Sequence, residues 1–374
     1  MSQKPNAPRF DTHPDYWEEY TNFQNVKHFI IKRYLSGWFN IMATRNGRIL
    51  YFDTHAGRGR HETGELGSPL VALHALLNHR LKDQILSQCE VIFYFVEIDP
   101  ANFKHLKEEI SSIGELPEKI KLRPIGADSF SVLKEILRDL RSRNAQLAPA
   151  FFFIDPYGIS IPGDLLHELM QYPKVELFVN IIWRELDAQM HQQGKPGVSE
   201  NIDKYFRGEE WRDIIETRES DERANKAINL LRKKIDALWA TYIFMMRDHS
   251  AIRYILLHLT NHDKGRDLIK DCLWSICPHA QVEGSFFARK TEDYRQMQLL
   301  SAEPDLSPLF DWCKKELEGG PRRWQEIIDD LRSELWIESQ LNKVIRDMRK
   351  NGVIKPSDFT GRFSGKRNPL LELA

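Results

Sequence analysis

The sequence lacks the features that would place the protein in several large classes. Its 4 cysteines are unevenly spaced and form neither a disulfide framework nor a familiar zinc-ligand pattern, so we expect no metal site. No apolar run approaches the roughly 20 residues that span a bilayer. Residues 1–10 have neither the basic flank nor the apolar core of a secretory signal. We therefore expect a cytoplasmic protein with no membrane partner.

The sequence also lacks an excess of charge of either sign. Lysine and arginine number 53, aspartate and glutamate 54, and the formal net charge is −1. Any contact with nucleic acid must then come from a local patch rather than from the field of the whole chain. With 374 residues, 41% of them hydrophobic and 29% charged, the composition is typical of a globular protein with two or three domains.

Short apolar runs alternate with helical patterns over most of the chain. The runs cover residues 49–52, 91–96, 151–154, 177–182 and 254–259. Continuous apolar runs of this length are typical of strands buried on both faces, and apolar spacings of three and four between them indicate helices. Strands that alternate with helices predict an α/β fold, with a mostly parallel, doubly wound sheet.

The same patterns predict how the chain is divided. The expected segments are 1–45 (N-terminal helical segment), 46–303 (sheet domain), 304–320 (linker rich in proline and glycine) and 321–374 (C-terminal domain). Within the sheet domain, a polar and helical stretch at about 198–248 predicts an insertion. Its apolar stripe includes Leu238 and Trp239.

The C-terminal domain shows a pattern of two helices followed by a hairpin. Apolar spacing predicts helices over 324–331 and 337–348, with strands at 353–355 and 369–373. This is the order of a winged helix-turn-helix. Between residues 343 and 368, eight lysines and arginines stand against two acids, which predicts contact with DNA or RNA. The expected nucleic-acid-binding residues are Lys343, Arg346, Arg349, Lys350, Arg362, Lys366 and Arg367. A solvated basic face, or a face for protein contacts, is the alternative.

The first expected strand ends in an acid that precedes glycines. Asp53 is followed by Ala56, Gly57 and Gly59, and glycines at this place let the backbone approach a nucleotide-like ligand. The third glycine of the dinucleotide fingerprint is replaced by Glu62, and no phosphate-binding Walker sequence is present. Hydride transfer and nucleoside triphosphate chemistry are therefore disfavoured.

Two further acids follow the next two expected strands. Glu97 follows the second strand, where a carboxylate can accept hydrogen bonds from ribose hydroxyls. Asp128 follows a third strand at 121–125, where it could accept a hydrogen bond from an adenine amino group. Each acid alone is more often a helix cap or a loop residue. Their succession at strand ends favours a shared ligand site.

The fourth expected strand leads into Asp155, Pro156, Tyr157 and Gly158. Proline fixes the backbone after the acid, so the carboxylate stays at the strand edge while the tyrosine ring can stack on a base. An acceptor and a stacking ring are what chemistry at an exocyclic base amine requires. We therefore expect Asp155, Pro156 and Tyr157 to be catalytic. The alternative is an ordinary β-turn, for which this sequence is also suited.

Several other polar residues are candidates for the same cleft. They are His55 and His61 near the glycines, Arg184 and Glu185 after the fifth strand, and Asn261 and His262 after the last. Four further residues on the N-terminal helix could guide a phosphate backbone: Lys27, His28, Lys32 and Arg33. A solvated charged face and solvated loop histidines are the alternatives.

The order of the four acids resembles that of class I S-adenosylmethionine-dependent methyltransferases. More closely, the chain resembles the bacterial three-Cys-motif partner proteins (TcmP). The matching segments are 27–35 (KHFIIKRYL), 52–57 (FDTHAG), 67–70 (GSPL), 153–158 (FIDPYG) and 259–262 (LTNH). The tail resembles the winged helix-turn-helix of some members.

The resemblance implies a Rossmann-like methyltransferase fold, S-adenosylmethionine as cofactor and a three-Cys-motif, radical-enzyme-like protein as partner. It implies Asp53, Ala56, Gly57, Gly59, Glu97 and Asp128 as cofactor-binding residues. Two functions stay open: methyl transfer to a base amine of nucleic acid, or a non-catalytic scaffold on nucleic acid with a relict cofactor fold. The loop at 58–69 is longer than usual for such a sheet, so we expect it to reshape or close the cofactor site.

Overall fold

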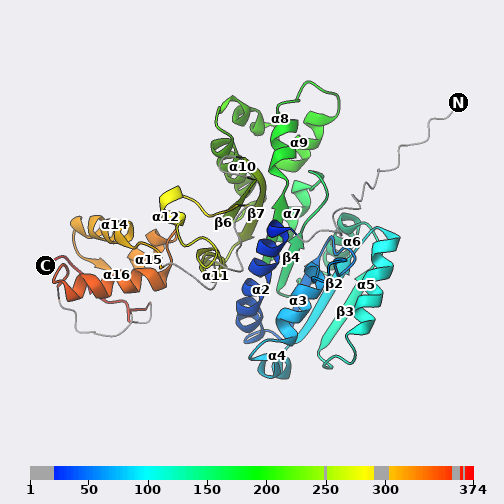
Figure 1. Ribbon diagram of the computed structural model, residues 1–374, viewed down its shortest axis with the longest axis horizontal. Coiled ribbons are helices and arrows are strands. Elements are labelled where there is room, and N and C mark those ends of the chain that lie inside the picture. Colours follow the sequence, from blue (N-terminus) through cyan, green and yellow to red (C-terminus); the bar gives the residue numbers. More distant parts are fainter. Residues whose placement is uncertain (1–20, 248–250, 290–302, 356–362, 365–366) are drawn as a thin grey trace.

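The centre of the molecule is an eight-stranded sheet (Figure 1). The structure is a computed structural model, and it describes residues 21–247, 251–289, 303–355, 363–364 and 367–374. The strands are β1 (Arg48–Asp53), β2 (Glu90–Val96), β3 (Ile120–Ile125), β4 (Ala150–Ile154), β5 (Val175–Ile181), β6 (Trp239–Met246), β7 (Ile252–Thr260) and β8 (Phe287–Arg289). All five predicted apolar runs and the predicted third strand lie in or overlap these strands.

The strand order is β3-β2-β1-β4-β5-β7-β6-β8. Strands β1 to β5 pair in parallel, β7 runs antiparallel to both β5 and β6, and β8 is parallel to β6. The predicted α/β fold with a Rossmann-like, doubly wound sheet is therefore confirmed. The winding reverses between β1 and β4, and in such sheets ligands bind beyond the carboxyl ends of the strands at this point.

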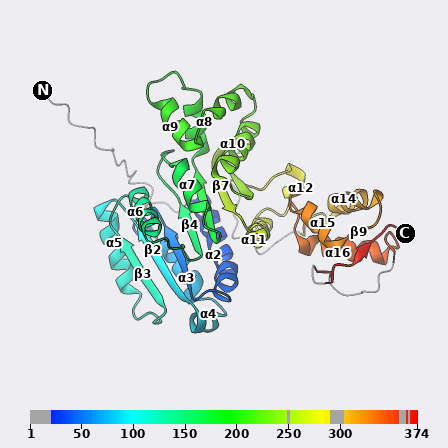
Figure 2. The ribbon, with the colours of Figure 1, turned by 180° about the vertical axis from the view of Figure 1, so that it is seen from behind.

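Helices cover both faces of the sheet. They are α2 (Asn22–Ala43), α3 (Ser68–Leu77), α4 (Lys82–Gln88), α5 (Pro100–Ser112), α6 (Ser129–Ser142), α7 (Gly163–Met170), α8 (Trp183–Met190), α9 (Val198–Phe206), the 3-10 helix η1 (Glu210–Glu216), α10 (Ser220–Ile235), α11 (Asp263–Trp274) and α12 (Ala280–Glu283). On one face α2 packs against α3 and α11, and on the other α7 packs against α6 and α10 (Figures 1 and 2).

A row of aromatic rings shows how the apolar runs form this sheet. Strand register places Tyr94, Phe52 and Phe152 side by side on β2, β1 and β4, and their rings stack with centroids 4.4 and 4.5 Å apart. Such pairs stabilise neighbouring strands beyond the area that they bury. Because the same register pairs Asp53 with residues of β2 and β4, the acids that follow the three strands leave the sheet at one edge.

The N-terminal helix begins with a capping box. Thr21 accepts a hydrogen bond from the Gln24 backbone, and the Gln24 side chain accepts one from the Thr21 backbone N–H, 2.7 Å away. The predicted helical region over 16–44 is thus confirmed from Asn22 onward, and residues 16–20 lie outside the described residues. Apolar side chains such as Ile30, Leu35 and Trp38 are buried against the sheet domain.

The predicted helical insertion at 198–248 is right only in its first part. Helices α9, η1 and α10 fill it, but α10 ends at Asp236, whose φ of 62° is left-handed, and Trp239 begins β6 in the central sheet. The prediction that the helical insertion continues through Leu238 and Trp239 was wrong. Leu238 is 53% exposed, so it does not continue the buried stripe of α10.

The C-terminal segment holds α14 (Ser307–Glu318), β9 (Arg322–Arg323), α15 (Trp324–Leu331), α16 (Glu338–Lys350) and β10 (Leu370–Leu371). The two predicted helices are confirmed, but the expected linker contains α14, which packs on α16. Leu309, Cys313 and Leu317 give α14 a buried face that proline and glycine counts did not reveal. The predicted hairpin consists of a single bridge between Ile354 and Leu373, while β10 pairs with β9.

The C-terminal segment contacts the sheet domain through α11. The Arg266 guanidinium donates to the carbonyl oxygens of Leu331 and Glu334, each 3.1 Å away. The indoles of Trp274 and Trp336 stack with centroids 5.1 Å apart. These contacts involve the turn between α15 and α16, so they fix where α16 begins relative to the sheet.

Within the described residues no helix has the length and apolarity that crossing a bilayer requires.

Candidate active site

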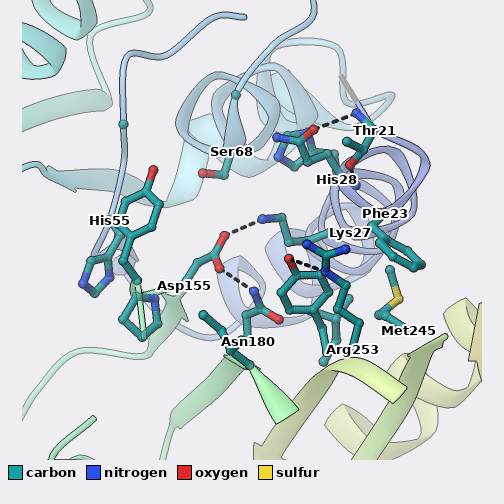
Figure 3. A pocket seen from close by; sticks show the side chains of 18 of the residues that line it. Thr21, Phe23, Lys27, His28, His55, Ser68, Asp155, Asn180, Met245 and Arg253 are labelled. Carbon is teal, nitrogen blue, oxygen red and sulfur yellow. Dashed lines mark hydrogen bonds and ion pairs between the residues drawn. The ribbon is translucent and has the colours of Figure 1, made fainter. Parts of the chain in front are cut away.

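A cavity of about 590 Å³ opens at the carboxyl edge of β1, β2, β4 and β5. Its walls come from α2, from the loop after β1, from the segment after β4 and from the end of β6 and the start of β7 (Figure 3). Both its volume and its place at the reversal of the winding are typical of a small-molecule site. Two of the four predicted acids, Glu97 and Asp155, line it.

One half of the cavity is formed by the glycine loop after β1 and by Glu97. Ala56 and Gly57 line the wall, and Gly57 has a φ of 61°, which favours glycine. The Gly57 N–H donates to one Glu97 carboxylate oxygen at 2.7 Å, and the Asp99 N–H donates to the other at 2.7 Å. Burial raises the pKa of Glu97, while these two N–H groups act in the opposite direction. We call these residues, Ala56, Gly57 and Glu97, the glycine half.

Asp53 lies beneath this half and not on its wall. The side chain is fully buried at the end of β1, and burial raises its pKa to about 7, against the hydrogen bond of the Ser68 hydroxyl. The nearby negative charge of Asp155 raises it further. Asp53 therefore changes its charge state near neutral pH.

The long loop after the glycines folds on itself. Gly59 packs against Leu106 of α5 rather than facing the cavity, and its carbonyl oxygen accepts from the Gly67 N–H at 2.8 Å. Arg60 also anchors the loop to α5 through a 2.9 Å ion pair with Glu109. The loop reshapes the site, as expected, because His61, Gly67 and Ser68 supply one wall. It leaves the cavity in place.

Asp128 does not join the other acids. Its side chain is exposed and accepts from the Ser131 N–H at 2.8 Å, which makes it the N-cap of α6. It is not among the residues that line the cavity. Of the four strand-end acids, the structure thus places Glu97 and Asp155 on the cavity wall, Asp53 below it and Asp128 outside it.

The other half of the cavity is centred on Asp155. One carboxylate oxygen is paired with the Lys27 ammonium of α2, and the other accepts from the Asn180 carboxamide at 2.6 Å (Figure 3). Burial would raise the pKa of Asp155, but Lys27 and Asn180 outweigh it and lower the pKa. The carboxylate is therefore ionised at neutral pH. We call Lys27, Asp155 and Asn180 the acid-centred half.

The residues after Asp155 line the cavity as well. Pro156, Tyr157 and Gly158 all contribute to its wall, and Tyr157 is 56% exposed. Gly158 has a φ of 80°, so the chain turns sharply after the tyrosine. A largely exposed ring at the rim of a cavity is available for stacking on a planar group.

Three histidines surround the junction of the two halves. Burial lowers the pKa of His55 and of His61 to about 4. Burial and the positive charge of Lys27 lower the pKa of His28 well below its usual value. All three are therefore neutral at pH 7, which leaves Lys27 as the positive charge at this point of the cavity.

Several cavity residues were not predicted. Asn180, Met245, Arg253 and Tyr254 line the wall, and Arg184 and Glu185 do so as expected. Asn180 lies inside an apolar run and Arg253 at the start of another, so neither stands at the strand end where a site residue was sought. The sequence signal that could have revealed Asn180 is a single polar residue inside an apolar run.

The prediction that Asn261 and His262 line the cleft was wrong. They bond to backbone carbonyls of Met170 and Pro173, residues that precede β5. Since β7 runs antiparallel to β5, the end of β7 lies at the opposite edge of the sheet, and its start, with Arg253 and Tyr254, lies at the cavity. The apolar runs gave no strand direction.

Five of the seven residues of the expected basic face lie within the described residues. Lys343, Arg346, Lys350 and Arg367 are exposed, and Arg349 lies over the Phe363 ring, 5.3 Å from its centroid. Arg362 and Lys366 lie outside the described residues. Trp336, just before α16, stacks on Trp274, so the start of α16 faces the sheet domain. The exposed basic residues of α16 lie in its middle and C-terminal part.

The described residues contain no cluster of three or more histidines, cysteines or acids that could hold a metal ion.

No family model and no curated protein sequence matches the chain. Among solved structures it is similar to Trm1 from Pyrococcus horikoshii in complex with S-adenosyl-L-methionine, with 11% identity, a TM-score of 0.39 and coverage of 68% of this chain and 60% of that one. It is also similar to human methyltransferase-like protein 13 in complex with SAH (12% identity, TM-score 0.35, coverage 64% and 83%).

A third similar structure is a Legionella pneumophila protein of the DUF519 family, with 13% identity, a TM-score of 0.35 and coverage of 63% and 85%. Since these TM-scores are below 0.5, the likenesses carry no weight for the function of this chain. The Rossmann-like fold is established by the strand order and directions of its own sheet.

Proposed function

We propose that the cavity binds S-adenosylmethionine and that the protein is a methyltransferase-like protein acting on a base amine of nucleic acid. The observation that carries this proposal is the composition of a single cavity at the reversal of the sheet. A glycine-bounded carboxylate lines one half, and an ionised Asp155 followed by an exposed tyrosine lines the other.

The glycine half suits the nucleoside end of the cofactor. Glu97 has spare lone pairs on oxygens that already accept backbone N–H groups, so ribose hydroxyls can bond to a carboxylate held in place. The adjacent Ile98 is 40% exposed next to this wall, and although it is not among the residues that line the cavity, we propose that it offers an apolar surface to the adenine ring. Asp128, which caps α6 outside the cavity, has no part in this proposal.

The acid-centred half suits the acceptor. When bound, S-adenosylmethionine supplies an electrophilic methyl group. Asp155 would accept an N–H of the base amine and turn the nitrogen lone pair toward that methyl, while Tyr157 stacks on the ring. Methyl transfer would form a carbon–nitrogen bond as the carbon–sulfur bond breaks, the sulfur would keep the bonding electrons, and the amine held by Asp155 would lose one proton to solvent.

The C-terminal segment supports a nucleic-acid substrate. Its order of helix, short strand, helix, helix and bridged hairpin is compatible with the winged helix that we propose, and Lys343, Arg346 and Lys350 are exposed on α16. Such residues would follow phosphates with little sequence reading. A three-Cys-motif protein remains the partner we propose, on the resemblance described above.

A second candidate function is a scaffold with a relict cofactor fold. One observation favours it: the Asp155 carboxylate is already paired with Lys27 and bonded by Asn180. A ligand must therefore share or replace these partners before Asp155 can act. In a relict site such internal pairing would be permanent.

Transfer of labelled methyl groups separates the two candidates. The full chain is incubated with labelled S-adenosylmethionine and total cellular nucleic acid, with and without the partner protein. Methyl transfer would identify the protein as a methyltransferase. We expect Asp155→Ala to abolish the transfer, while Asp164→Ala, a change at an exposed acid on α7, should leave it intact. No transfer under either condition, with cofactor binding intact, would establish the scaffold.

A further inference from the structure

The acid-centred half of the cavity presents an incomplete set of hydrogen bonds. The Asn180 carboxamide nitrogen donates to Asp155, which fixes the orientation of the group and leaves its oxygen as an acceptor. Asn180 is only 8% exposed, and this oxygen has no hydrogen-bond partner among the described residues. A buried acceptor without a partner is costly, so it calls for a donor from a ligand.

The neighbouring groups define what that ligand must offer. Each Asp155 carboxylate oxygen accepts one bond from the protein and has lone-pair capacity for another. The Lys27 ammonium, paired with one Asp155 oxygen, adds a positive charge beside these acceptors. The set therefore offers three acceptor positions, two on Asp155 and one on Asn180, beside one positive charge. Figure 3 shows Lys27 and Asn180 reaching Asp155 from its two ends.

From this count we infer that the acceptor half recognises the Watson–Crick edge of a guanine nucleotide. That edge carries three N–H bonds, one on N1 and two on the 2-amino group, beside the O6 carbonyl. Adenine and cytosine offer two N–H bonds there, and uracil offers one. Guanine alone among these bases supplies a donor for Asn180 as well as for both Asp155 oxygens, and its O6 carbonyl suits the positive charge of Lys27.

Arg253 explains why the ligand is a nucleotide rather than a free base. Its Nε donates to the Tyr254 hydroxyl at 3.2 Å and its guanidinium lies 5.5 Å from the centroid of that ring. Over the part of the chain that the structure describes, Arg253 has no carboxylate partner. It lines the same cavity on the side of Asn180, where its terminal amino groups can bind a phosphate (Figure 3).

This inference deepens the proposed function and rests on it for the view that a base enters this half. It can nevertheless be tested without the cofactor. The full chain is titrated by calorimetry with the 5′-monophosphates of guanosine, inosine, adenosine and cytidine. Inosine monophosphate is the decisive probe, because it differs from guanosine monophosphate only in lacking the 2-amino group.

We expect guanosine monophosphate to bind tightest, and inosine monophosphate to bind at least about tenfold more weakly, because the Asn180 oxygen and one Asp155 oxygen then lack their donor. In Asn180→Leu the ratio of the two affinities should narrow, because only the bond from the 2-amino group to Asp155 still separates the two nucleotides, while Asn201→Leu, the same change at an exposed position on α9, should keep the wild-type ratio. Arg253→Gln should weaken all four nucleotides alike and leave guanosine itself unaffected.

Equal affinity of the wild-type chain for the guanine and inosine nucleotides, or for guanine and adenine nucleotides, would overturn the inference. So would the absence of binding at millimolar concentrations. These results need no variant, so a poorly folded Asn180→Leu cannot obscure them. Selective guanine binding without S-adenosylmethionine binding would leave the inference standing and remove the proposed cofactor, and the reverse result would remove the inference alone.

Discussion

The two halves of the cavity are built in different ways. In the glycine half, the Glu97 carboxylate is held by backbone N–H groups of Gly57 and Asp99. In the acid-centred half, Asp155 is held by side chains from α2 and β5, 128 and 25 positions away along the chain. The first arrangement depends on loop conformation and the second on the packing of α2 against the sheet. Substitutions in the glycine half should therefore affect mainly ligand binding, and substitutions in the acid-centred half should affect fold stability as well as ligand binding.

The largest effect is expected from Lys27→Met. The side chains of Lys27 and Asp155 are 9% and 15% exposed, so the variant leaves a buried carboxylate without its counter-ion. We expect a loss of about 3 kcal/mol in the free energy of unfolding at pH 7, measured with urea. Arg33→Met, which breaks an exposed pair with Asp271, should cost at most about 0.5 kcal/mol.

This effect should depend on pH in a defined direction. The pKa of Asp155 is lowered in the folded protein, so the stabilisation is fully present above the unfolded-state value of about 3.9 and is lost as the pH falls through the folded value. The double variant Lys27→Met with Asp155→Asn should recover most of the loss. An equal loss in the single and double variants would show that the ion pair does not organise this half.

Next in size is the effect of Glu97→Ala on cofactor binding. Loss of a carboxylate that accepts ribose hydroxyls should weaken S-adenosylmethionine binding about a hundredfold, roughly 2.7 kcal/mol, measured by calorimetry. Glu90→Ala, at the start of the same strand and paired with Arg48, should leave the affinity unchanged. Unchanged affinity in Glu97→Ala would separate the glycine half from the cofactor.

A smaller effect concerns Asp53. Its pKa of about 7 is above the unfolded value, so the folded state retains a proton that the unfolded state has lost, and stability falls as the pH rises toward and through 7. Between pH 6 and pH 8 the wild type should lose about 1.4 kcal/mol relative to Asp53→Asn. If the free energy of unfolding changed with pH in the same way in both proteins, Asp53 would not have a raised pKa in the folded state.

The smallest effect lies outside the cavity and asks whether the acceptor is part of a macromolecule. The double variant Lys343→Ala with Arg346→Ala should weaken binding to mixed-sequence DNA or RNA about fivefold and lower the salt dependence by about two counterions. The matched control is Lys104→Ala with Lys107→Ala, two exposed lysines on α5. Equal effects of both pairs would leave α16 without a special role.

The comparison of the halves also shows what the sequence reveals. The apolar runs and the acids at strand ends are local patterns, and they predicted the sheet and the positions of Glu97 and Asp155. Strand direction is not local. The reversal of β7 moved Asn261 away from the cavity and brought Arg253 to it, because antiparallel pairing with β5 is decided by packing.

The side chains around Asp155 were the least predictable part of the site. Lys27 was one of several charged residues on a helix, and no local feature marked it as the partner of Asp155. Asp128 shows the opposite error, because an acid at a strand end also satisfies the first backbone N–H groups of the next helix, and here it does so. Residue type and place could not decide between the two roles.

The central claim is that one cavity receives the cofactor between Glu97 and Asp155. A crystal structure of the chain with S-adenosylhomocysteine, the demethylated product, tests it most directly. The account predicts ribose hydroxyls bonded to Glu97 and a sulfur atom facing the Asp155 side of the cavity. A ligand bound elsewhere, or an empty cavity with the ligand at saturating concentration in the crystals, would contradict it.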